Sequence, residues 1–436
     1  MNRQALTGIM KYTPSRSRDS SNDGIGSHRA YLKSLYFFVF VASGFVMPFS
    51  SLFFKHALVH PDGTTADELI GWIYFFMPLV GIFANIPAGI VADKLQLGRH
   101  LITFFCFAVA VFTLLTGLFG DSFTSAWSLE TRFTWMFIAV MAYYMFSMPI
   151  IPTVDGETMI HLNRTAEQGS YGRIRVFGTL GWSVACIFMG LVLNSYYHLP
   201  LIYYGSALAF LLLGGVSFRG LAFEKKPPLR RIPWEHLKKD RRFVLFLLFA
   251  FLNGMMWMAS FLYSSYFFDD VMDSPFEIGL VFGTWTIFEI PVMMFSRQLI
   301  RRFGNRWLIV FGLLFDGVRL ILFSLFTPET SFWLKWSAAS LQGAGYGLVQ
   351  LGTIDFVDRQ SHDDMKSIYM NITGLVRRTL ASSVGGKLGA SIIATYGANQ
   401  LMMGTGVGSL VLMLFFGLLV RGHGPRVAGE SEPCKT

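Results

Sequence analysis

Long stretches of apolar side chains alternate with short polar segments along almost the whole chain. Twelve of these stretches can form a helix that crosses a hydrocarbon layer of about 30 Å, which takes about 20 residues. Helices are expected because a chain inside a bilayer must pair its own backbone groups. The twelve predicted spans cover residues 31–54, 69–92, 101–119, 134–158, 174–194, 199–222, 243–268, 277–300, 307–327, 334–357, 368–395 and 398–420.

The composition supports a membrane protein and argues against a soluble domain of this length. Of the 436 residues, 53% are hydrophobic and 14% are charged, whereas about 25% of the residues in an ordinary soluble domain are charged. We therefore expect an all-α polytopic protein surrounded by the lipid bilayer. The three cysteines have no metal-ligand spacing, so we expect neither a metal nor a cofactor.

Basic side chains gather in alternate loops. Eight lie between Lys225 and Arg242 and four lie in the 297–306 loop, while the intervening loops hold almost none beyond Lys55 and Arg132. This bias is the positive-inside rule, and it predicts that both termini are cytoplasmic in a multi-pass protein of the plasma or inner membrane. The net charge of +9 is therefore topological, and no nucleic-acid partner is expected.

The chain divides into two similar halves of six spans. The strongest break is the charged, proline-containing segment 224–242. Ile70-Gly71 and Ile278-Gly279 open corresponding apolar stretches, each with an internal proline. Duplicated halves are typical of alternating-access transporters, whose ligand site lies between the halves. The predicted organisation is a disordered cytoplasmic tail (1–30), an N-terminal six-helix bundle (31–223), a cytoplasmic linker (224–242), a C-terminal six-helix bundle (243–420) and a second cytoplasmic tail (421–436).

A motif follows the second predicted span. It comprises Gly89, Asp93 and Lys94, followed by Gly98 and Arg99. It resembles the G-x-x-x-D-[RK]-x-G-[RK]-[RK] signature of the major facilitator superfamily, with one extra residue before Gly98. The resemblance implies a twelve-helix carrier in which this aspartate joins a charge network that holds the inward gate shut. The corresponding segment of the second half is basic but contains no acid.

Glu157, Arg175 and Trp182 form a second constellation. Glu157 and Arg175 are eighteen residues apart, at the facing ends of two predicted spans, so antiparallel helices would place them at similar depth with Trp182 about two turns deeper. Charged groups in this setting are usually functional. The alternative is a structural or interfacial ion pair. Gln342 is a further candidate ligand donor within a span, or else a contact that packs helices together.

The pattern G-R-x-R-x-F-G-x-x-G-W that contains Arg175 and Trp182 resembles the oligosaccharide:proton symporter branch, which includes lactose permease. There, an equivalent Glu and Arg bind sugar hydroxyls and an equivalent Trp stacks on the sugar ring. The resemblance implies these roles for Glu157, Arg175 and Trp182. Phenylpropionate-type and nucleoside permeases share much of the pattern, so it indicates the branch rather than the substrate.

Candidate proton-coupling residues lie in the second half. Asp316 and Arg319 are three residues apart, so they share one helix face and can pair. The resemblance implies proton-coupling roles for Arg319, for Glu289 and for Arg377, which corresponds to a lysine of helix eleven. The branch's His and Glu of helix ten are absent from 340–344, so the proton carrier must be Glu289 or Asp316, with Asp355 as a possible participant. The alternative is that Asp316 and Arg319 form a plain buried ion pair.

These observations predict a secondary active transporter that moves a small hydroxylated solute, a sugar or a nucleoside, together with protons. A proton-coupled permease for an aromatic or carboxylic acid is one alternative, with Arg175 and Arg319 binding the carboxylate. A sensor or assembly factor on a carrier scaffold that no longer transports is another. An enzyme is not expected, because no nucleophile–base pair, phosphate loop or metal cluster is visible. The fold suggests a monomer.

Overall fold

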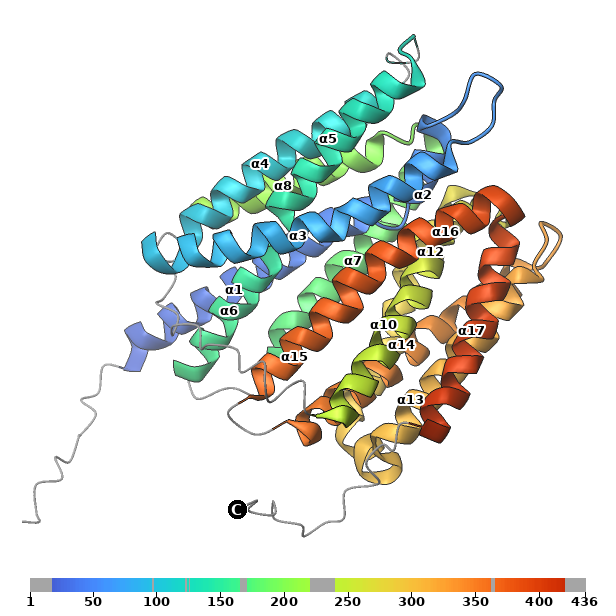
Figure 1. Cartoon of the computed structure of the whole chain (residues 1–436). Helices are drawn as coiled ribbons and strands as arrows, with labels where there is room; N and C mark the ends of the chain where they lie inside the picture. Colours follow the sequence, from blue (N-terminus) through green and yellow to red (C-terminus); the bar gives the residue numbers. More distant parts are fainter. Residues whose placement is uncertain are drawn as a thin grey trace, which may run out of the picture.

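The computed structural model describes residues 18–95, 98–121, 124, 126–164, 171–219, 240–361 and 365–419. These residues form helices and short connections, and the part of the chain described contains no strand. Residues 1–17, the second predicted tail and most of the predicted linker lie outside the described residues, whereas residues 18–30 of the first predicted tail, expected to be disordered, are helical. Figure 1 shows the helices running side by side in one bundle.

The helices fall into two groups, one from each half of the chain. The first half consists of α1 (Arg18–Val46), α2 (Ser50–Ala57), α3 (Asp67–Leu95), α4 (Gly98–Phe119), α5 (Leu129–Ser147), α6 (Ile150–Arg164), α7 (Tyr171–Ser195) and α8 (Leu201–Arg219). The second half consists of α10 (Arg241–Leu262), α11 (Ser264–Val271), α12 (Pro275–Met294), α13 (Ser296–Ser324), α14 (Phe332–Gln360), α15 (Lys366–Leu375), the π-helical turn η3 (Val376–Leu380), α16 (Ala381–Tyr396) and α17 (Ala398–Leu419).

Several predicted spans consist of two helices joined at a break. Pro48 separates α1 from α2, and Pro149 separates α5 from α6, because proline lacks the N–H that a continuous helix requires. Within α13, Gly304 has a φ of 67°, a backbone conformation that favours glycine. Side-chain caps mark other starts: Ser128 accepts a hydrogen bond from the N–H of Thr131 at the start of α5.

Ten helical stretches of the described chain are long and apolar enough to cross a membrane. The predicted spans at 334–357 and 368–395 are helical too, but they are not among these ten. They contain polar side chains that include Gln342, Gln350, Arg377 and Lys387. The prediction of an all-helical membrane protein is confirmed, while the count of twelve spans stays a prediction.

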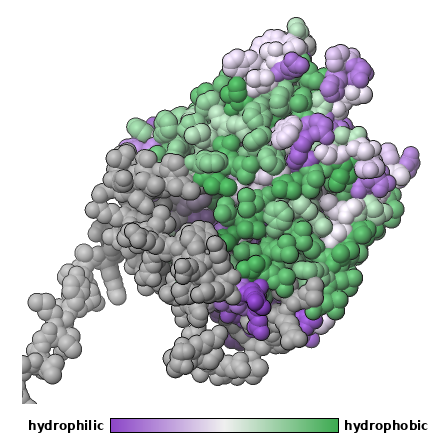
Figure 2. Space-filling view, in the orientation of Figure 1, coloured by the Kyte–Doolittle hydropathy of each residue, from purple (hydrophilic) through white to green (hydrophobic). Residues whose placement is uncertain are grey.

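Large apolar side chains cover the sides of the bundle. Phe83, Met294 and Leu418 are each more than 70% exposed. Figure 2 shows this apolar surface along the helices, with polar residues gathered toward the ends of the bundle. An apolar patch of this extent is untenable in water, and lipid is the solvent that suits it.

Among the described residues, the two halves share a buried apolar core at one end of the bundle. We call the end at which α2, α11 and the start of α3 lie the distal face, and the end at which α8 ends and α10 begins the terminal face. One buried apolar cluster contains residues of both halves, including Leu58 and Phe268. Two other clusters, around Leu32 and around Phe246, each belong to a single half. The halves therefore share a core near the distal face and have separate cores toward the terminal face.

Glycines allow a close approach between the halves, where α7 packs on α12. A Cβ atom added at Gly279 would lie 2.5 Å from the carbonyl oxygen of Cys186, and one at Gly190 would lie 3.1 Å from Cα of Gly279. Small residues let helix backbones approach in this way in membranes. This contact needs glycine because its neighbours are backbone atoms, which cannot move aside.

Candidate functional site

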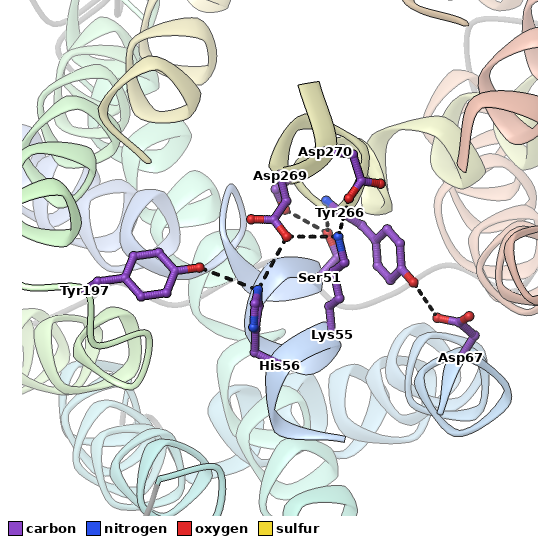
Figure 3. Close-up of polar contacts among 9 residues, drawn as sticks. Ser51, Lys55, His56, Asp67, Tyr197, Tyr266, Asp269 and Asp270 are labelled. Carbon is purple, nitrogen blue, oxygen red and sulfur yellow. Dashed lines mark hydrogen bonds and ion pairs between the residues drawn. The ribbon is translucent and has the colours of Figure 1, made fainter. Parts of the chain in front are cut away.

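The distal face carries a cluster of charged residues that joins the halves (Figure 3). Lys55 of α2 donates to Asp269 Oδ2 at 2.8 Å and to Asp270 Oδ1 at 2.7 Å, both on α11. His56 Nε2 lies 3.4 Å from Asp269 Oδ2 and 3.5 Å from the hydroxyl of Tyr197. Burial tends to raise the pKa of Asp269, but hydrogen bonds from His56 and Lys55 outweigh it and hold that pKa below its ordinary value. Asp269 therefore stays ionised in the cluster.

Neutral hydrogen bonds extend the cluster inward. The hydroxyls of Ser51 and Ser265 are 2.7 Å apart, and the backbone N–H of Tyr266 donates to Ser51 at 3.1 Å. The hydroxyl of Tyr266 donates to Asp67 at 3.0 Å, at the start of α3. Ser51 and Ser265 are fully or almost fully buried, so these bonds form only while the two halves are in contact.

The sequences of α2 and α11 are related. The helix α2 reads SSLFFKHA and α11 reads SSYFFDDV, so each has two serines and two phenylalanines at the same positions. The last polar positions differ in sign, with Lys55 and His56 on one helix and Asp269 and Asp270 on the other. Equivalent residues meet across the interface, since Ser51 contacts Ser265 and Lys55 contacts Asp269. The interface is thus a pseudo-twofold contact made specific by opposite charge.

A second cross-half ion pair lies beside this cluster. Lys387 of α16 pairs with Glu68 of α3, and Ser391 donates to the same carboxylate at 3.1 Å. The described residues that join the halves by hydrogen bonds or ion pairs all come from the distal part or the middle of the bundle. The conformation is therefore closed at the distal face.

A small cavity lies inside the second half. Trp257 and Tyr346 stack with their ring centroids 5.1 Å apart, which gives the cavity an aromatic wall. Asn253 also lines it and is 4% exposed. The indole N–H of Trp257 has no hydrogen-bond partner among the described residues. Buried polar groups without partners are unusual in folded proteins, so this N–H is suited to meet a ligand.

Charged residues complete this cavity. Arg377 donates to Gln350 at 2.5 Å and lies over the ring of Tyr346. It is positioned by η3, the π-helical turn that interrupts the α15–α16 helix, and such turns are frequent at functional sites. Asp316 faces the cavity from α13. The wall therefore combines stacked rings, an amide, a guanidinium and a carboxylate.

The structure brings Asp316 and Arg319 together, as their spacing suggests. An Nη of Arg319 lies 2.7 Å from Asp316 Oδ1, and Ser409 donates to Oδ2 at 3.3 Å. Arg319 is 2% exposed and its guanidinium stands over the rings of Trp285 and Phe323. Whether this pair carries a proton stays a prediction.

Glu157 and Arg175, in contrast, do not meet. Glu157 is 2% exposed and its Oε1 lies 3.8 Å from Nε2 of His28. Arg175 stands over the rings of Tyr36 and Phe40, 5.2 and 4.3 Å from their centroids. The acid in this neighbourhood is Asp155, which accepts hydrogen bonds from Tyr36 and from Tyr171. Asp155 and Glu157 lie about 200° apart around α6, so only one can face α7.

Trp182 lies between the halves, and Gln342 lies in the core of the second half. The indole N–H of Trp182 donates to the carbonyl of Phe282 at 3.2 Å, one turn from a Ser183–Thr286 contact. Trp182 thus joins α7 to α12 in this conformation. Gln342 is 5% exposed, and its Oε1 has no hydrogen-bond partner among the described residues.

Glu289 and Asp355 lie apart from the cavity. Glu289 packs against Gly347 of α14, and its carboxylate interacts electrostatically with Arg175 across the two halves. Asp355 accepts from Asn305 at 3.0 Å and pairs with Arg359 at 2.8 Å, toward the terminal face. The predicted gating residues Gly89, Asp93, Lys94 and Arg99 fall in α3 and α4, but their side chains lie outside the described residues.

Sequence reasoning missed the distal cluster and Asp155. Lys55 is one of the few basic residues in the loops that otherwise hold almost none. Asp269 is the first acidic residue after the predicted span 243–268. The repeat S-S-x-F-F with opposite charges after it is the signal that could have paired them. Asn253, Trp257 and Tyr346 carry no signature that separates a cavity wall from helix packing.

The fold and these sites define a membrane transporter of the major facilitator type. The profile of the MFS_1 like family matches residues 30–403, and the chain belongs to this family. It is similar to the uncharacterized transporter YwbF of Bacillus subtilis, with 28% identity over 76% of this chain and 78% of that protein. It is also similar to the maltose permease of Geobacillus stearothermophilus, with 25% identity over 94% and 98%.

A further relative is the putative nucleoside transporter YegT of Escherichia coli, with 22% identity over 78% of this chain and 79% of that protein. Among solved structures, the nucleoside transporter NupG superposes with a TM-score of 0.77 at 16% identity, covering 89% of this chain and 98% of that one. At this identity the likeness concerns the fold. The expectations of a transporter and of a protein that is not an enzyme are thereby confirmed.

Proposed function

We propose that this protein is a proton-coupled symporter for a small hydroxylated solute, a sugar or a nucleoside. The observation that carries the proposal is the second-half cavity, where the Trp257–Tyr346 stack, with the unpaired indole N–H of Trp257, adjoins the amide of Asn253. Aromatic faces suit a sugar ring or a base, and an amide and a guanidinium suit hydroxyl and carbonyl groups. Similarity to a maltose permease and to a putative nucleoside transporter supports the same solute class.

Alternating access follows from the one-sided closure. The halves touch at the distal face through Lys55 and Asp269 and have separate cores toward the terminal face. Rocking of the halves about the α7–α12 contact would break the distal cluster and join the terminal ends. Basic residues such as Arg219, Arg241 and Arg301 lie toward the terminal face, which supports a cytoplasmic terminal face and an outward distal face.

Glu289 is the proposed proton carrier, and Arg175 is the group that discharges it. The two already interact electrostatically across the halves. Closure of the terminal side would shorten their separation, and a nearby guanidinium favours the ionised carboxylate. Proton release would then accompany a conformational change, which is what coupling requires. Asp316, with Arg319 as its partner, is the second candidate.

Counterflow in proteoliposomes tests the solute class. Labelled uridine, maltose and phenylpropionate are offered separately to the full-length protein, and exchange of uridine or maltose is expected. Exchange of phenylpropionate alone would overturn the proposal and favour the acid permease. The Asn253→Ala variant should lose most of the exchange, because it removes a buried amide from the cavity wall.

A non-transporting sensor on the same scaffold is distinguished by variants. Arg175→Ala and Asn253→Ala should abolish uptake if the protein is a carrier. A sensor that does not transport would show no uptake in the wild type, and its cellular role would survive both substitutions. The unpaired indole N–H of the second-half cavity favours the carrier.

A further inference from the structure

A lysine is buried near the distal face of the second half, where it binds backbone carbonyls. Lys335 of α14 is 1% exposed. Its ammonium group donates to the carbonyl of Val271 and to that of Pro328. Val271 is the last residue of α11, and Pro328 lies between α13 and α14. Burial of a charge is costly unless other groups replace the lost water, and here the end of α11 and a loop replace it.

The first half contains the same arrangement. The guanidinium of Arg132, on α5, donates to the carbonyl of Ala57 at 2.9 Å and to that of Thr124 at 3.0 Å. Ala57 is the last residue of α2, and Thr124 lies between α4 and α5. Each cation therefore joins the end of one short distal helix to the loop that precedes the cation's own helix.

The two cations also occupy equivalent places in the sequence. Ser128 precedes α5 and Ser331 precedes α14, and the cation is the fourth residue after the serine in both segments, SLETR and SFWLK. The helix α5 begins the fourth predicted span of the first half, and α14 forms the fourth of the second half. Because both halves place a cation at this position, on the same two kinds of carbonyl, we assign the two cations a common role.

Short helices need support at their ends. The helices α2 and α11 have eight residues each, and a helix of this length depends on tertiary contacts. The last carbonyls of a helix lack partners within it and carry partial negative charge. A cation at this end satisfies a carbonyl and stabilises the helix, and it fixes the direction of the helix relative to its bundle.

These contacts differ from those of the distal cluster in what they join. Lys55 and Asp269 connect one half to the other (Figure 3), so their contact must break when the distal face opens. Arg132 and Lys335 bind within their own halves, so their contacts persist when the halves separate. A distal helix that is held in this way moves together with its half, as rigid-body rocking requires.

We propose that Arg132 and Lys335 are positioning residues that fix α2 and α11 to their halves, so that the distal face opens only as the halves rock. The proposal rests on the alternating access proposed above and is independent of the solute and of the coupling ion. When the cation of the first half is lost, α2 swings away from α11 while the rest of its half stays in place. Lys55 then no longer lies opposite Asp269.

Substitutions at the half-buried Arg132 test the proposal. In full-length protein in proteoliposomes, Ser265→Cys reports distal opening through its rate of reaction with a membrane-impermeant thiol reagent. Arg132→Met should raise this rate about fivefold, because the end of α2 loses its cation. Arg132→Lys should restore a rate within about twofold of the parent, because it keeps the positive charge there. Glu130→Gln, which changes an exposed side chain in the same turn of α5, is the matched control and should leave the rate unchanged.

A second readout separates loss of the anchor from rocking of the halves. Spin labels at Arg219→Cys on α8 and Arg301→Cys on α13 report the separation of the halves near the terminal face. Arg132→Met should leave these distances as in the parent, because only α2 moves. Asp269→Asn/Asp270→Asn leaves both anchors in place and should shift the distances toward shorter values, because the whole halves rock.

An unchanged thiol rate in Arg132→Met would overturn the proposal, and so would a shift of its terminal distances like that of the Asp269→Asn/Asp270→Asn variant. If the latter variant opens the distal face without shifting the terminal distances, the halves do not rock and both proposals fail. Neither readout uses a solute, so a protein that transports neither uridine nor maltose would overturn the proposed function alone.

Discussion

The Nζ atom of Lys55 lies 2.8 Å from Oδ2 of Asp269, and this contact joins two helices whose residues are 214 positions apart. Asp270 lies on the other side of the same ammonium group at 2.7 Å. The helices are equivalent members of the two halves, with matching serines and phenylalanines and opposite charges. Opposite charge at equivalent positions favours contact between the halves and disfavours contact between two copies of either half alone.

Removing the acids should open the distal face. Each partly exposed ion pair is worth about 0.2–1 kcal/mol, so Asp269→Asn/Asp270→Asn should raise the open population several-fold. A cysteine placed at the buried Ser265 reports opening through its rate of reaction with a membrane-impermeant thiol reagent. Glu329→Gln, which removes an acid that faces the solution on the same side, should leave the rate unchanged. An unaltered rate in the double variant would show that the cluster does not hold the face shut.

The distal closure should withstand mild acid. Because the pKa of Asp269 is lowered in the closed state, its contribution is complete above the ordinary aspartate pKa of about 4 and is lost only as the pH falls through the lowered value. Thiol reactivity at position 265, divided by the thiolate fraction at each pH, should therefore stay level between about pH 8 and pH 5. A marked rise over this range would contradict the assignment.

The glycine contact between α7 and α12 should be intolerant of a single methyl group. In Gly279→Ala the new Cβ would meet the backbone oxygen of Cys186, so the halves cannot close on the distal side. Uptake should fall at least about tenfold, with increased thiol reactivity at the distal face. Gly404→Ala adds a Cβ that meets nothing within 4 Å and should keep normal uptake. Normal uptake in Gly279→Ala would place the closing contact elsewhere.

Removing one member of the Asp316–Arg319 pair should destabilise the protein more than removing both. Arg319→Met leaves a buried carboxylate without its partner and should cost about 3–5 kcal/mol. The double variant Asp316→Asn/Arg319→Met should recover much of this loss, because it removes both charges. Melting temperatures of the purified proteins measure the difference. If the double variant is as unstable as the single one, the two residues are not an isolated pair.

Glu289 should be needed for accumulation but not for exchange. In Glu289→Gln the side chain can no longer take up and release a proton, while the cavity around Trp257 and Tyr346 is intact. We expect counterflow near the wild-type rate and loss of proton-driven accumulation. Asp316→Asn is the comparison. If Glu289→Gln keeps accumulation and Asp316→Asn loses it, the proton carrier is Asp316 of the second-half cavity.

Apolar stretches predicted most of the fold because a bilayer leaves the backbone few choices. The helices, the division after span six and the pairing of Asp316 with Arg319 all depend on short sequence distances. Breaks at Pro48 and Pro149 also have a local cause, since proline cannot continue a helix. Among the described residues, Glu157 lies beside His28, and Arg175 lies over the rings of Tyr36 and Phe40, because a difference of two residues between Asp155 and Glu157 reverses the face of α6. The role of Glu157 and Arg175 in binding stays a prediction.

Contacts between the halves could not be predicted in the same way. Periodicity shows which face of a helix is polar, but it does not show which other helix that face contacts. The Lys55–Asp269 pair depends on how the two six-helix units pack. Comparing α2 with α11 before assigning partners would have found this pair, since only these two short helices share S-S-x-F-F with opposite charges.

Solute uptake with simultaneous recording of external pH tests the central claim most directly. Unbuffered cells that produce the protein are given uridine or maltose, and cells with Asn253→Ala serve as the control. Uptake of one of these solutes with alkalinisation of the medium, absent from the control, is the result expected of a proton symporter for hydroxylated solutes. Uptake without proton movement, or no uptake of either solute, would contradict it.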